Sequence, residues 1–354
     1  MHPFSVQLCL LAASAVTAAS LPCRSESRPV HLPVRNVASL TEIPSFLERI
    51  IRRPNGDFLV TQLEKEGQLW LLKNAISPDA HLTALHNFAP ANGVAGIAAV
   101  AEDTYIVMAQ QFYSFLDAVP NTTTIWEIEF PAPFSDNYVL RKAASIPSAG
   151  FLNGMATLPQ YPTVALLGDS FNGQVVRLDV NTGKYETVLD VPELHASAGA
   201  AFPVGINGLQ IHNGYMYWSN TARVGMYRIA INEHGYPRNG SQTETLAIIA
   251  GISGIDDFRF DKLGNIWSLA NLDNQVFVLE KGLDPWSEYH TYQFVAGGLN
   301  SSEIPGPTDC AWGVGEQSHI LYATTSGGSK APINGTYVEP AKVAAVDTTA
   351  FFQR

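Results

Sequence analysis

A repeated pattern of short apolar runs separated by glycine-containing turns constrains this chain more than any other feature. Residues 203–229 hold three such runs, GINGLQI, YMYWSNT and GMYRIAI, and a turn at His212-Asn213-Gly214 separates the first two. The lengths of the runs and their β-branched and aromatic residues predict three antiparallel strands. So small a sheet cannot bury both of its faces alone, so further copies are expected in the chain.

Five other segments repeat this order of strand, turn and strand. They are residues 46–72, 93–130, 152–189, 253–280 and 307–347. Six such units predict an all-β protein, a six-bladed β-propeller, with the blades arranged around a central channel. The segment 31–40, HLPVRNVASL, is predicted to add a strand to the last blade and so to close the ring.

The amino-terminal segment has the character of a secretory signal. Residues 1–20 are apolar and end in small residues, and the segment is too short to span a bilayer. A membrane-anchored variant is the alternative, because only the amino terminus and His2 could carry positive charge there. We expect a signal peptide over residues 1–20, one propeller domain over residues 21–354 and no membrane span, since no other segment approaches the ~20 apolar residues of a transmembrane helix.

Cysteines and sequons fit the same secretory pathway. Once the signal with Cys9 is removed, Cys23 and Cys310 remain, and an oxidising compartment favours one disulfide between the amino-terminal arm and the last blade. Such a bond would help to close the ring. N-glycosylation sequons occur at Asn121, Asn239, Asn300 and Asn334. We therefore expect a secreted glycoprotein.

Charge and motif content exclude several classes of function. A net charge of -11 and a pI near 5.2 leave no basic surface for phosphate groups, so nucleic-acid binding is excluded. The sequence contains no HExxH, CxxC, GxSxG or GxxxxGK motif. His195 and His212 are alternative acids or bases, although a lone histidine is more often structural.

Oxygen-bearing side chains recur at the start of the predicted inner strands, which a propeller gathers around its channel. The set comprises Glu48, Asn153, Asn207, Asp256, Asp257 and Asp309. Converging carboxylates and amides suit a hard cation such as Ca²⁺. The alternative is that these side chains bond to backbone at strand starts, as Asn and Asp often do in turns.

At these residues the chain resembles the six-bladed propellers of the senescence-marker-protein, gluconolactonase and paraoxonase group. The resemblance rests on FLERIIRRPNGDFLVT, LNGMA, GINGLQI with YWSNT, DDFRFDKLGNIW and LYATTSGG. It implies a Ca²⁺ ion in the channel held by Glu48, Asn153, Asn207 and Asp256 or Asp257, and hydrolysis of lactones or esters. Two departures stand out, because INGL replaces the usual Asn-Asp pair and Arg49 follows the glutamate.

A closer resemblance is to secreted fungal propellers of natural-product pathways, among them the hetero-Diels-Alderases of tropolone sesquiterpenoid (meroterpenoid) biosynthesis. LNGMA, GINGL, DDF, the signal, the sequons and the early and late cysteines carry it. It implies a secondary-metabolite enzyme that joins a tropolone-derived ortho-quinone methide to a humulene-type sesquiterpene. Small apolar substrates are the expected partners, and no cofactor is required.

For this cycloaddition we expect a polar floor and aromatic walls. The predicted catalytic residues are Asn153, Asn207 and Asp257, and the predicted pocket residues are Phe151, Phe202, Trp312 and Asp309, since the aromatic residues are expected near the starts of inner strands. One alternative is a Ca²⁺-dependent lactonohydrolase or esterase with Glu48, Asn153, Asn207 and Asp256 as ligands. Another is a binding propeller without enzymatic activity.

Overall fold

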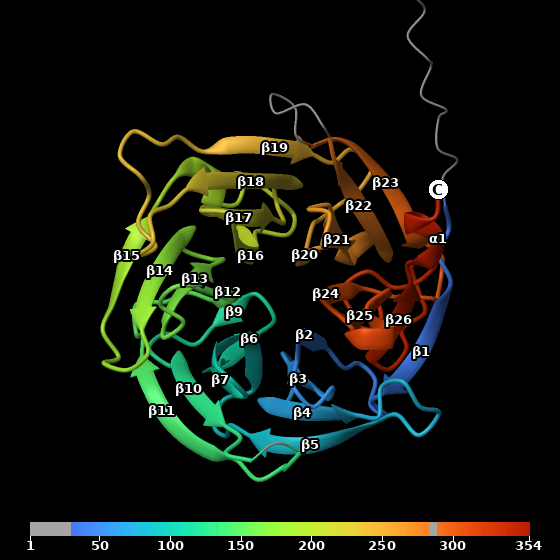
Figure 1. Ribbon diagram of the computed structural model, residues 1–354, viewed down its shortest axis with the longest axis horizontal. Coiled ribbons are helices and arrows are strands. Elements are labelled where there is room, and N and C mark those ends of the chain that lie inside the picture. Colours follow the sequence, from blue (N-terminus) through green and yellow to red (C-terminus); the bar gives the residue numbers. More distant parts are fainter. Residues whose placement is uncertain (1–29, 133, 283–288) are drawn as a thin grey trace, which may run out of the picture.

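The chain folds into a ring of four-stranded antiparallel sheets, as the repeats predict. The computed structural model describes residues 30–132, 134–282 and 289–354, and within these residues there are six such sheets and one additional two-stranded sheet. Figure 1 shows the six sheets as blades around a common axis, with β2, β6, β12, β16, β20 and β24 innermost. Each of these inner strands contacts the next around the whole ring. The prediction of a six-bladed propeller is therefore confirmed.

The blades follow one another along the chain. Blade 1 consists of β2 (Leu47–Arg52), β3 (Phe58–Gln62), β4 (Gln68–Lys73) and β5 (His81–Asn87). Blade 2 consists of β6 (Gly93–Ala101), β7 (Thr104–Gln110), β10 (Thr124–Glu129) and β11 (Val139–Ser145). Blade 3 consists of β12 (Leu152–Thr157), β13 (Val164–Asp169), β14 (Gln174–Asp179) and β15 (Tyr185–Leu189).

The second half of the ring repeats this order. Blade 4 consists of β16 (Ile206–His212), β17 (Tyr215–Asn220), β18 (Gly225–Ala230) and β19 (Glu244–Ile248). Blade 5 consists of β20 (Phe258–Phe260), β21 (Ile266–Ala270), β22 (Gln275–Lys281) and β23 (Tyr289–Gly297). Blade 6 consists of β24 (Pro307–Trp312), β25 (Ile320–Thr325), β26 (Lys342–Asp347) and β1 (Val34–Ser39).

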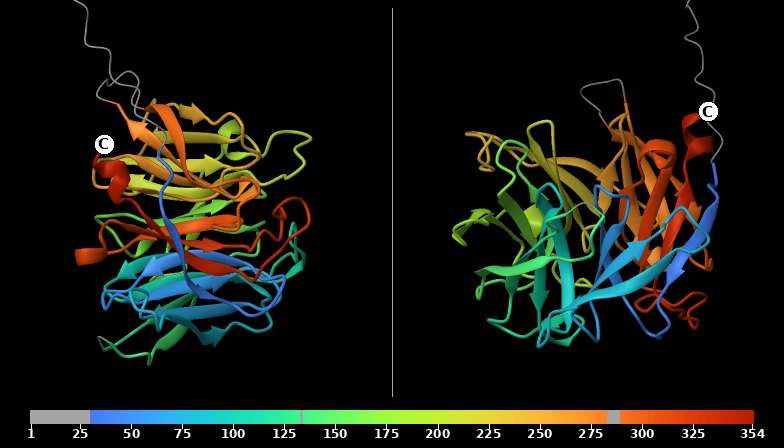
Figure 2. Two further views of the ribbon diagram at one scale, coloured as in Figure 1. Left: turned by 90° about the vertical axis from the view of Figure 1, so that its right-hand side faces the viewer. Right: turned by 60° about the horizontal axis from the view of Figure 1, so that its bottom comes forward.

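The first strand of the chain closes the ring. β1 lies antiparallel to β26, with Val34 opposite Val346 and Ser39 opposite Lys342. In Figure 2 the blue amino-terminal strand runs beside the red carboxy-terminal blade. The prediction that residues 31–40 complete the last blade is thus confirmed. Cys23 lies outside the described residues, so the structure does not describe the predicted disulfide; Cys310 is fully buried in β24.

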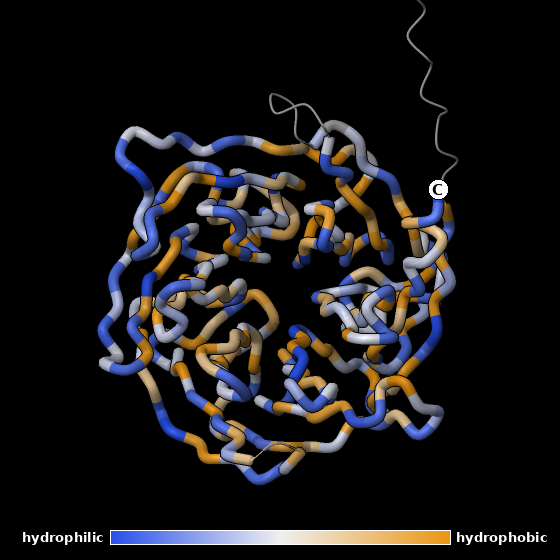
Figure 3. Tube along the Cα trace, viewed as in Figure 1, coloured by the Kyte–Doolittle hydropathy of each residue, from blue (hydrophilic) through white to orange (hydrophobic). Residues whose placement is uncertain are grey.

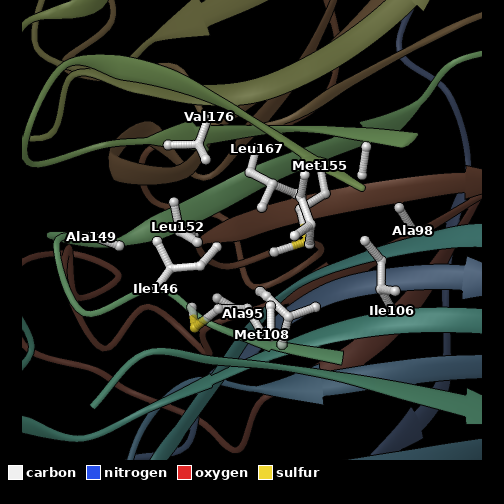
Figure 4. Packing of buried hydrophobic residues seen from close by; sticks show 14 of the residues in the cluster. Ala95, Ala98, Ile106, Met108, Ile146, Ala149, Leu152, Met155, Leu167 and Val176 are labelled. Carbon is white, nitrogen blue, oxygen red and sulfur yellow. The ribbon is translucent and has the colours of Figure 1, made fainter. Parts of the chain in front are cut away.

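The hydrophobic core is divided among the junctions between blades. Within the described residues the buried apolar side chains form six clusters, each shared mainly by two neighbouring blades. Figure 4 shows one of them, where Ile106 and Met108 of blade 2 pack against Leu152, Met155 and Leu167 of blade 3. Strands covered on both faces, such as the wholly buried β13, therefore read as continuous apolar runs.

The outer strands differ from the inner ones in polarity. β5, β11, β15 and β19 are largely exposed, and Figure 3 shows their hydrophilic residues along the rim of the ring. Helical structure in the described part of the chain is short: 3-10 turns at Pro192–Leu194, Asn271–Asp273 and Gly315–Gln317, and α1 (Thr349–Phe352). Within the described residues, no helix has the length and apolar character that crossing a membrane requires.

The predicted signal and the four sequons fall on different parts of the chain. Residues 1–20 lie outside the described residues. Asn121, Asn239, Asn300 and Asn334 are all exposed, as a glycosylation site must be.

Candidate functional site

The inner strands share an irregularity at one height. In five of them the pairing with the second strand shifts register across a pair of residues: Glu48-Arg49, Ala95-Gly96, Asn153-Gly154, Asn207-Gly208 and Thr308-Asp309. In blade 5 the corresponding pair, Asp256-Asp257, directly precedes β20. A β-bulge re-aims side chains, so each blade turns this pair toward the axis.

Glycine at the second place of the pair allows the inner strands to approach closely. A Cβ atom on Gly154 would lie 2.2 Å from the carbonyl oxygen of Asn207, and one on Gly208 would lie 2.6 Å from Oδ1 of Asp257. Blade 1 carries the long side chain of Arg49 at this place instead. The glycines at this place in blades 2, 3 and 4 leave it room at the axis.

The Arg49 guanidinium lies on the axis of the propeller. Its Nη2 atom is 2.6 Å from Oδ2 of Asp257 in blade 5 and donates a 3.3 Å hydrogen bond to Oδ1 of Asn153 in blade 3. The Arg49 side chain is fully buried. Blades 1, 3 and 5 alternate around the ring, so a group from blade 1 that touches both others must lie near its centre. We call Glu48, Arg49, Asn153, Asn207, Asp256 and Asp257 the axial cluster.

Two amides of the axial cluster form a chain of hydrogen bonds. Asn153 Nδ2 donates to Asn207 Oδ1 at 3.0 Å, and Asn207 Nδ2 donates to Thr221 Oγ1 at 3.0 Å. The Thr221 hydroxyl in turn donates to the carbonyl oxygen of Ile255 at 2.8 Å. Both asparagines are thereby fixed in orientation, and both amide oxygens accept a hydrogen bond from protein.

Three carboxyl groups of the axial cluster lack a full set of partners. Glu48 Oε2, Asp256 Oδ1 and Asp257 Oδ1 are buried and have no hydrogen-bond partner in the part of the chain that the structure describes. Burial raises the pKa of Glu48 to about 8, although Arg49 opposes the shift. Burial, reinforced by Glu48, also raises the pKa of Asp256 well above its ordinary value. Burial therefore favours the protonated form of both Glu48 and Asp256, and a protonated carboxyl group can donate a hydrogen bond.

Two ion pairs lie at and beside the axis. Asp257 pairs with Arg49, and Asp309 pairs with Arg259 at 2.8 Å. Burial raises the pKa of Asp257 to about 7, and the Arg49 guanidinium beside it opposes that shift. The guanidinium groups of Arg49 and Arg259 thus face the carboxyl groups of Asp257 and Asp309 in a region with little access to water.

Asp309, predicted as a pocket residue, joins the last blade to the first. Its Oδ2 accepts hydrogen bonds from the backbone N–H of Ile50 at 3.1 Å and from Arg259 Nη2 at 2.8 Å. Its Oδ1 accepts from the backbone N–H of Cys310 at 2.7 Å. Both carboxylate oxygens accept hydrogen bonds from protein, so Asp309 has a structural role where blade 6 meets blade 1.

An aromatic cover lies over the side of the cluster where the inner strands begin. The hairpin of β8 (Phe112–Ser114) and β9 (Asp117–Ala118) carries Phe115 at its tip. The Phe115 ring centroid is 5.3 Å from that of Phe46, just before β2, and 5.6 Å from that of Phe202, which precedes β16. These neighbours belong to blades 1 and 4, on opposite sides of the ring, so the hairpin spans the mouth of the channel.

Further contacts hold this cover in place. Lys330 Nζ lies 3.9 Å from the centroid of the Phe115 ring and 2.6 Å from Oε1 of Glu64. Phe112 packs edge-on against Phe151 with centroids 5.4 Å apart. The structure thus brings the predicted Phe151 and Phe202 into one aromatic group, joined by Phe112 and Phe115, which were not predicted. The only sequence signal for them is the aromatic run FYSF in the insertion of blade 2.

The expected position of Trp312 is wrong. Trp312 is the last residue of β24, at the opposite end of the inner strands from Phe151 and Phe202. It lines a cavity of about 350 Å³ together with Ile50, Met155 and Arg259. Because Ile50 directly follows Arg49, the axial cluster separates this cavity from the aromatic cover.

The two histidines considered as acids or bases have partners outside the axial cluster. His195 Nε2 is 2.7 Å from Oδ1 of the exposed Asp190. His212 ends β16 and stacks on Phe260 with ring centroids 4.4 Å apart.

The predicted calcium ligands do not fit a metal ion as they are arranged. The buried Arg49 guanidinium lies among them, and Asn153 Oδ1 already accepts from it. Among the described residues, no group of three or more His, Cys, Asp or Glu side chains is arranged to hold a metal ion. The positive charge on this axis is the guanidinium group of Arg49.

Comparison with known proteins agrees with the resemblance to hetero-Diels-Alderases. The chain is 29% identical over 333 residues to "Putative hetero-Diels-Alderase asR5" of Sarocladium schorii, covering 87% of this chain and 82% of that protein. It is 28% identical over 310 residues to "Putative hetero-Diels-Alderase" of Phoma sp, covering 79% of this chain and 83% of that protein. The resemblance to hetero-Diels-Alderases is confirmed. No protein-family model matches the chain.

Solved structures agree with the fold. A crystal structure titled "putative gluconolactonase" aligns with 91% of this chain and 93% of its own, with a TM-score of 0.56 and 15% sequence identity. The architecture is therefore shared with gluconolactonase-like propellers, while the sequence is closer to the hetero-Diels-Alderases.

Proposed function

We propose that this chain is a biosynthetic enzyme that joins a tropolone-derived ortho-quinone methide to a humulene-type sesquiterpene by an intermolecular hetero-Diels–Alder cycloaddition. The observation that carries this proposal is a pair of buried carboxyl groups, Glu48 and Asp256, near the axis and beneath an aromatic cover, where burial raises the pKa of both. The similarity to two proteins named as hetero-Diels-Alderases over most of the chain supports it.

The acid groups supply what such a reaction needs from a protein. In the cycloaddition two bonds form at once, no group leaves, and negative charge grows on the quinone-methide oxygen. A protonated Glu48 or Asp256 would donate a hydrogen bond to that oxygen and stabilise the transition state. Asn153, Asn207 and Asp257, predicted as catalytic, become positioning residues, because they bind Arg49 or one another.

The aromatic cover supplies the second requirement. Phe46, Phe115 and Phe202 form an apolar surface that would hold two flat or polyene partners face to face and exclude water. Holding two reactants in the reactive orientation removes much of the entropic barrier of a bimolecular reaction. Because Phe115 spans the channel mouth, substrate entry would require the hairpin to move.

The arrangement does not favour a calcium-dependent lactonase. That mechanism requires a metal to polarise the carbonyl and to acidify water, and Arg49 occupies the place where the ligands converge. The gluconolactonase-like structure, at 15% identity, supports the shared fold alone.

The experiment is turnover by purified protein of a tropolone alcohol, which forms the quinone methide by loss of water before the cycloaddition, with a humulene-type polyene. A panel of lactones is tested alongside, each with and without EDTA. We expect one stereodefined adduct whose rate EDTA leaves unchanged. Lactone hydrolysis that EDTA abolishes and Ca²⁺ restores would replace the proposal with the hydrolase. Tight substrate binding without any turnover would leave a binding propeller.

We also propose that the chain is secreted, glycosylated and closed by the Cys23–Cys310 disulfide. Leu32 and Cys310 belong to the same buried cluster, so the amino-terminal arm runs into the core that holds Cys310. The intact mass before and after treatment with a peptide N-glycosidase tests the sequons, and a non-reducing peptide map tests the bond. A free thiol on Cys310 in secreted protein would contradict the disulfide.

A further inference from the structure

We propose that Arg49 is the resident cation of the channel and that its side chain fills a latent site for a divalent cation. Loss of the guanidinium would convert the surrounding oxygen atoms into a site for a hard ion such as Ca²⁺. This inference rests on the contacts of the axial cluster and not on the cycloaddition.

The position of Arg49 is the first step. Its Nη2 atom contacts Asp257 Oδ2 at 2.6 Å and Asn153 Oδ1 at 3.3 Å, from blades on either side of the axis. A metal ion held by several blades has to lie where their side chains meet, and the guanidinium lies there. Asn153 Oδ1 would be released when Arg49 is truncated.

The unpartnered atoms are the second step. Three carboxylate oxygens of the axial cluster are buried without a hydrogen-bond partner among the described residues: Glu48 Oε2, Asp256 Oδ1 and Asp257 Oδ1. Buried polar atoms without partners are rare in folded proteins, and each requires an explanation. The Nε and Nη1 atoms of Arg49 are also buried without a partner, so the guanidinium and the oxygen atoms near it satisfy one another only in part.

The donor chemistry is the third step. Carboxylate and amide oxygens are the ligands that Ca²⁺ prefers, and the ion takes about six to eight of them, water included. The three carboxylate oxygens without a hydrogen bond and the amide oxygen of Asn153 would supply at least half of such a set. A bound divalent ion would hold Glu48 and Asp256 ionised, because metal ligands must lose their protons.

The chain offers a control in the other guanidinium near the axis. Arg259 pairs with Asp309 at 2.8 Å and lines the cavity on the far side of the axial cluster. Its nearest approach to the cluster is 3.7 Å, to Asp257 Oδ1, and its side chain is 19% exposed. Its truncation also removes a positive charge beside Asp257, but not the one among the predicted ligands.

The test compares Arg49→Ala with wild type and Arg259→Ala, all stripped with EDTA, by Tb³⁺ luminescence and by thermal melting with and without Ca²⁺. We expect Arg49→Ala to bind one Tb³⁺ that Ca²⁺ displaces, and to melt at a higher temperature with Ca²⁺ than without. Wild type and Arg259→Ala should show neither effect. Glu48→Gln added to Arg49→Ala should weaken Tb³⁺ binding at least tenfold.

Arg49→Gln serves as a second variant, because its neutral amide can still bond to Asp257. Recovery of either Arg49 variant only when Ca²⁺ is present during folding would support the proposal. The proposal is overturned if the folded variants bind no Tb³⁺, if neither variant folds with or without Ca²⁺, or if wild type binds Tb³⁺ in a way that Glu48→Gln abolishes. None of these readouts depends on turnover, so failure of the cycloaddition would leave this result unaffected.

Discussion

Arg49 and Asp257 form an ion pair across the axis of the propeller, with Nη2 and Oδ2 2.6 Å apart and both side chains almost completely buried. The two residues are far apart in the sequence and belong to blades that share no sheet. The pair therefore ties together two blades that are not neighbours in the ring, through a contact that water cannot easily replace.

Breaking the ion pair of Arg49 and Asp257 should destabilise the folded protein. Asp257→Asn is expected to lower the free energy of unfolding by about 3 to 5 kcal/mol, since it leaves a buried guanidinium without its carboxylate. Urea denaturation near pH 8 measures the loss, because Asp257, with a pKa of about 7, is ionised there. The exposed pair of Glu127 and Arg141 is the control, and Glu127→Gln should cost at most about 1 kcal/mol. Equal losses at both sites would contradict the buried pair.

Stability should depend on pH through Glu48. Burial raises its pKa from 4.5 to about 8, so the folded protein binds this proton more tightly than the unfolded chain does. The resulting stabilisation is complete below the unfolded pKa and is lost as pH rises through about 8, so the free energy of unfolding should fall across this range. Denaturation curves at several pH values should show a shallower decline for Glu48→Gln, which has no proton to lose. If wild type and Glu48→Gln lose stability equally as pH rises, the pH dependence does not arise from Glu48.

The rate of cycloaddition should also depend on whether Glu48 is protonated. A protonated Glu48 donates to the substrate oxygen, so kcat should fall as pH rises through about 8. Glu48→Ala should lose about 10²-fold in kcat, the usual cost of removing one such donor. Glu48→Gln keeps an N–H donor, and its residual rate should not change with pH through this range. An unaltered pH profile in Glu48→Gln would exclude Glu48 as the donor.

The hairpin supplies a test of the aromatic cover. Phe115→Ala removes the ring that bridges Phe46 and Phe202, so kcat/KM should fall while the melting temperature changes little. Tyr113→Ala is the matched control, because Tyr113 lies in the same hairpin but is 72% exposed. If the two variants behave alike, the hairpin does not contact the substrates.

The architecture was predictable because every blade repeats the same local signals. Turns such as Asn55-Gly56 and His212-Asn213-Gly214 separate runs of strand composition, and a ring of such units requires the early segment that became β1. Glu48, Asn153, Asn207 and Asp257 were predicted to converge because they occupy equivalent places in their repeats, and the axial cluster brings them together.

The role of Arg49 depends on features that a repeat pattern does not contain. Its position after Glu48 is visible in the sequence, but its direction follows from the bulge between Leu47 and Ile50, which turns both residues of the pair inward. Phe115 was missed for a related reason. Its hairpin is an insertion peculiar to blade 2, so no other repeat indicates where its tip would lie. Trp312 was placed at the wrong end because β24 extends over six residues, from Pro307 to Trp312.

The pairing of β1 with β26 also sets the order in which the molecule can be completed. β1 precedes the other described strands along the chain and β26 follows them, so this pairing can form only after the strands between them have been made. An open ring would leave Glu48, Arg49 and Asp257 accessible to water. The burial that raises the pKa of Glu48 and of Asp257 therefore depends on closure of the ring by β1 and β26.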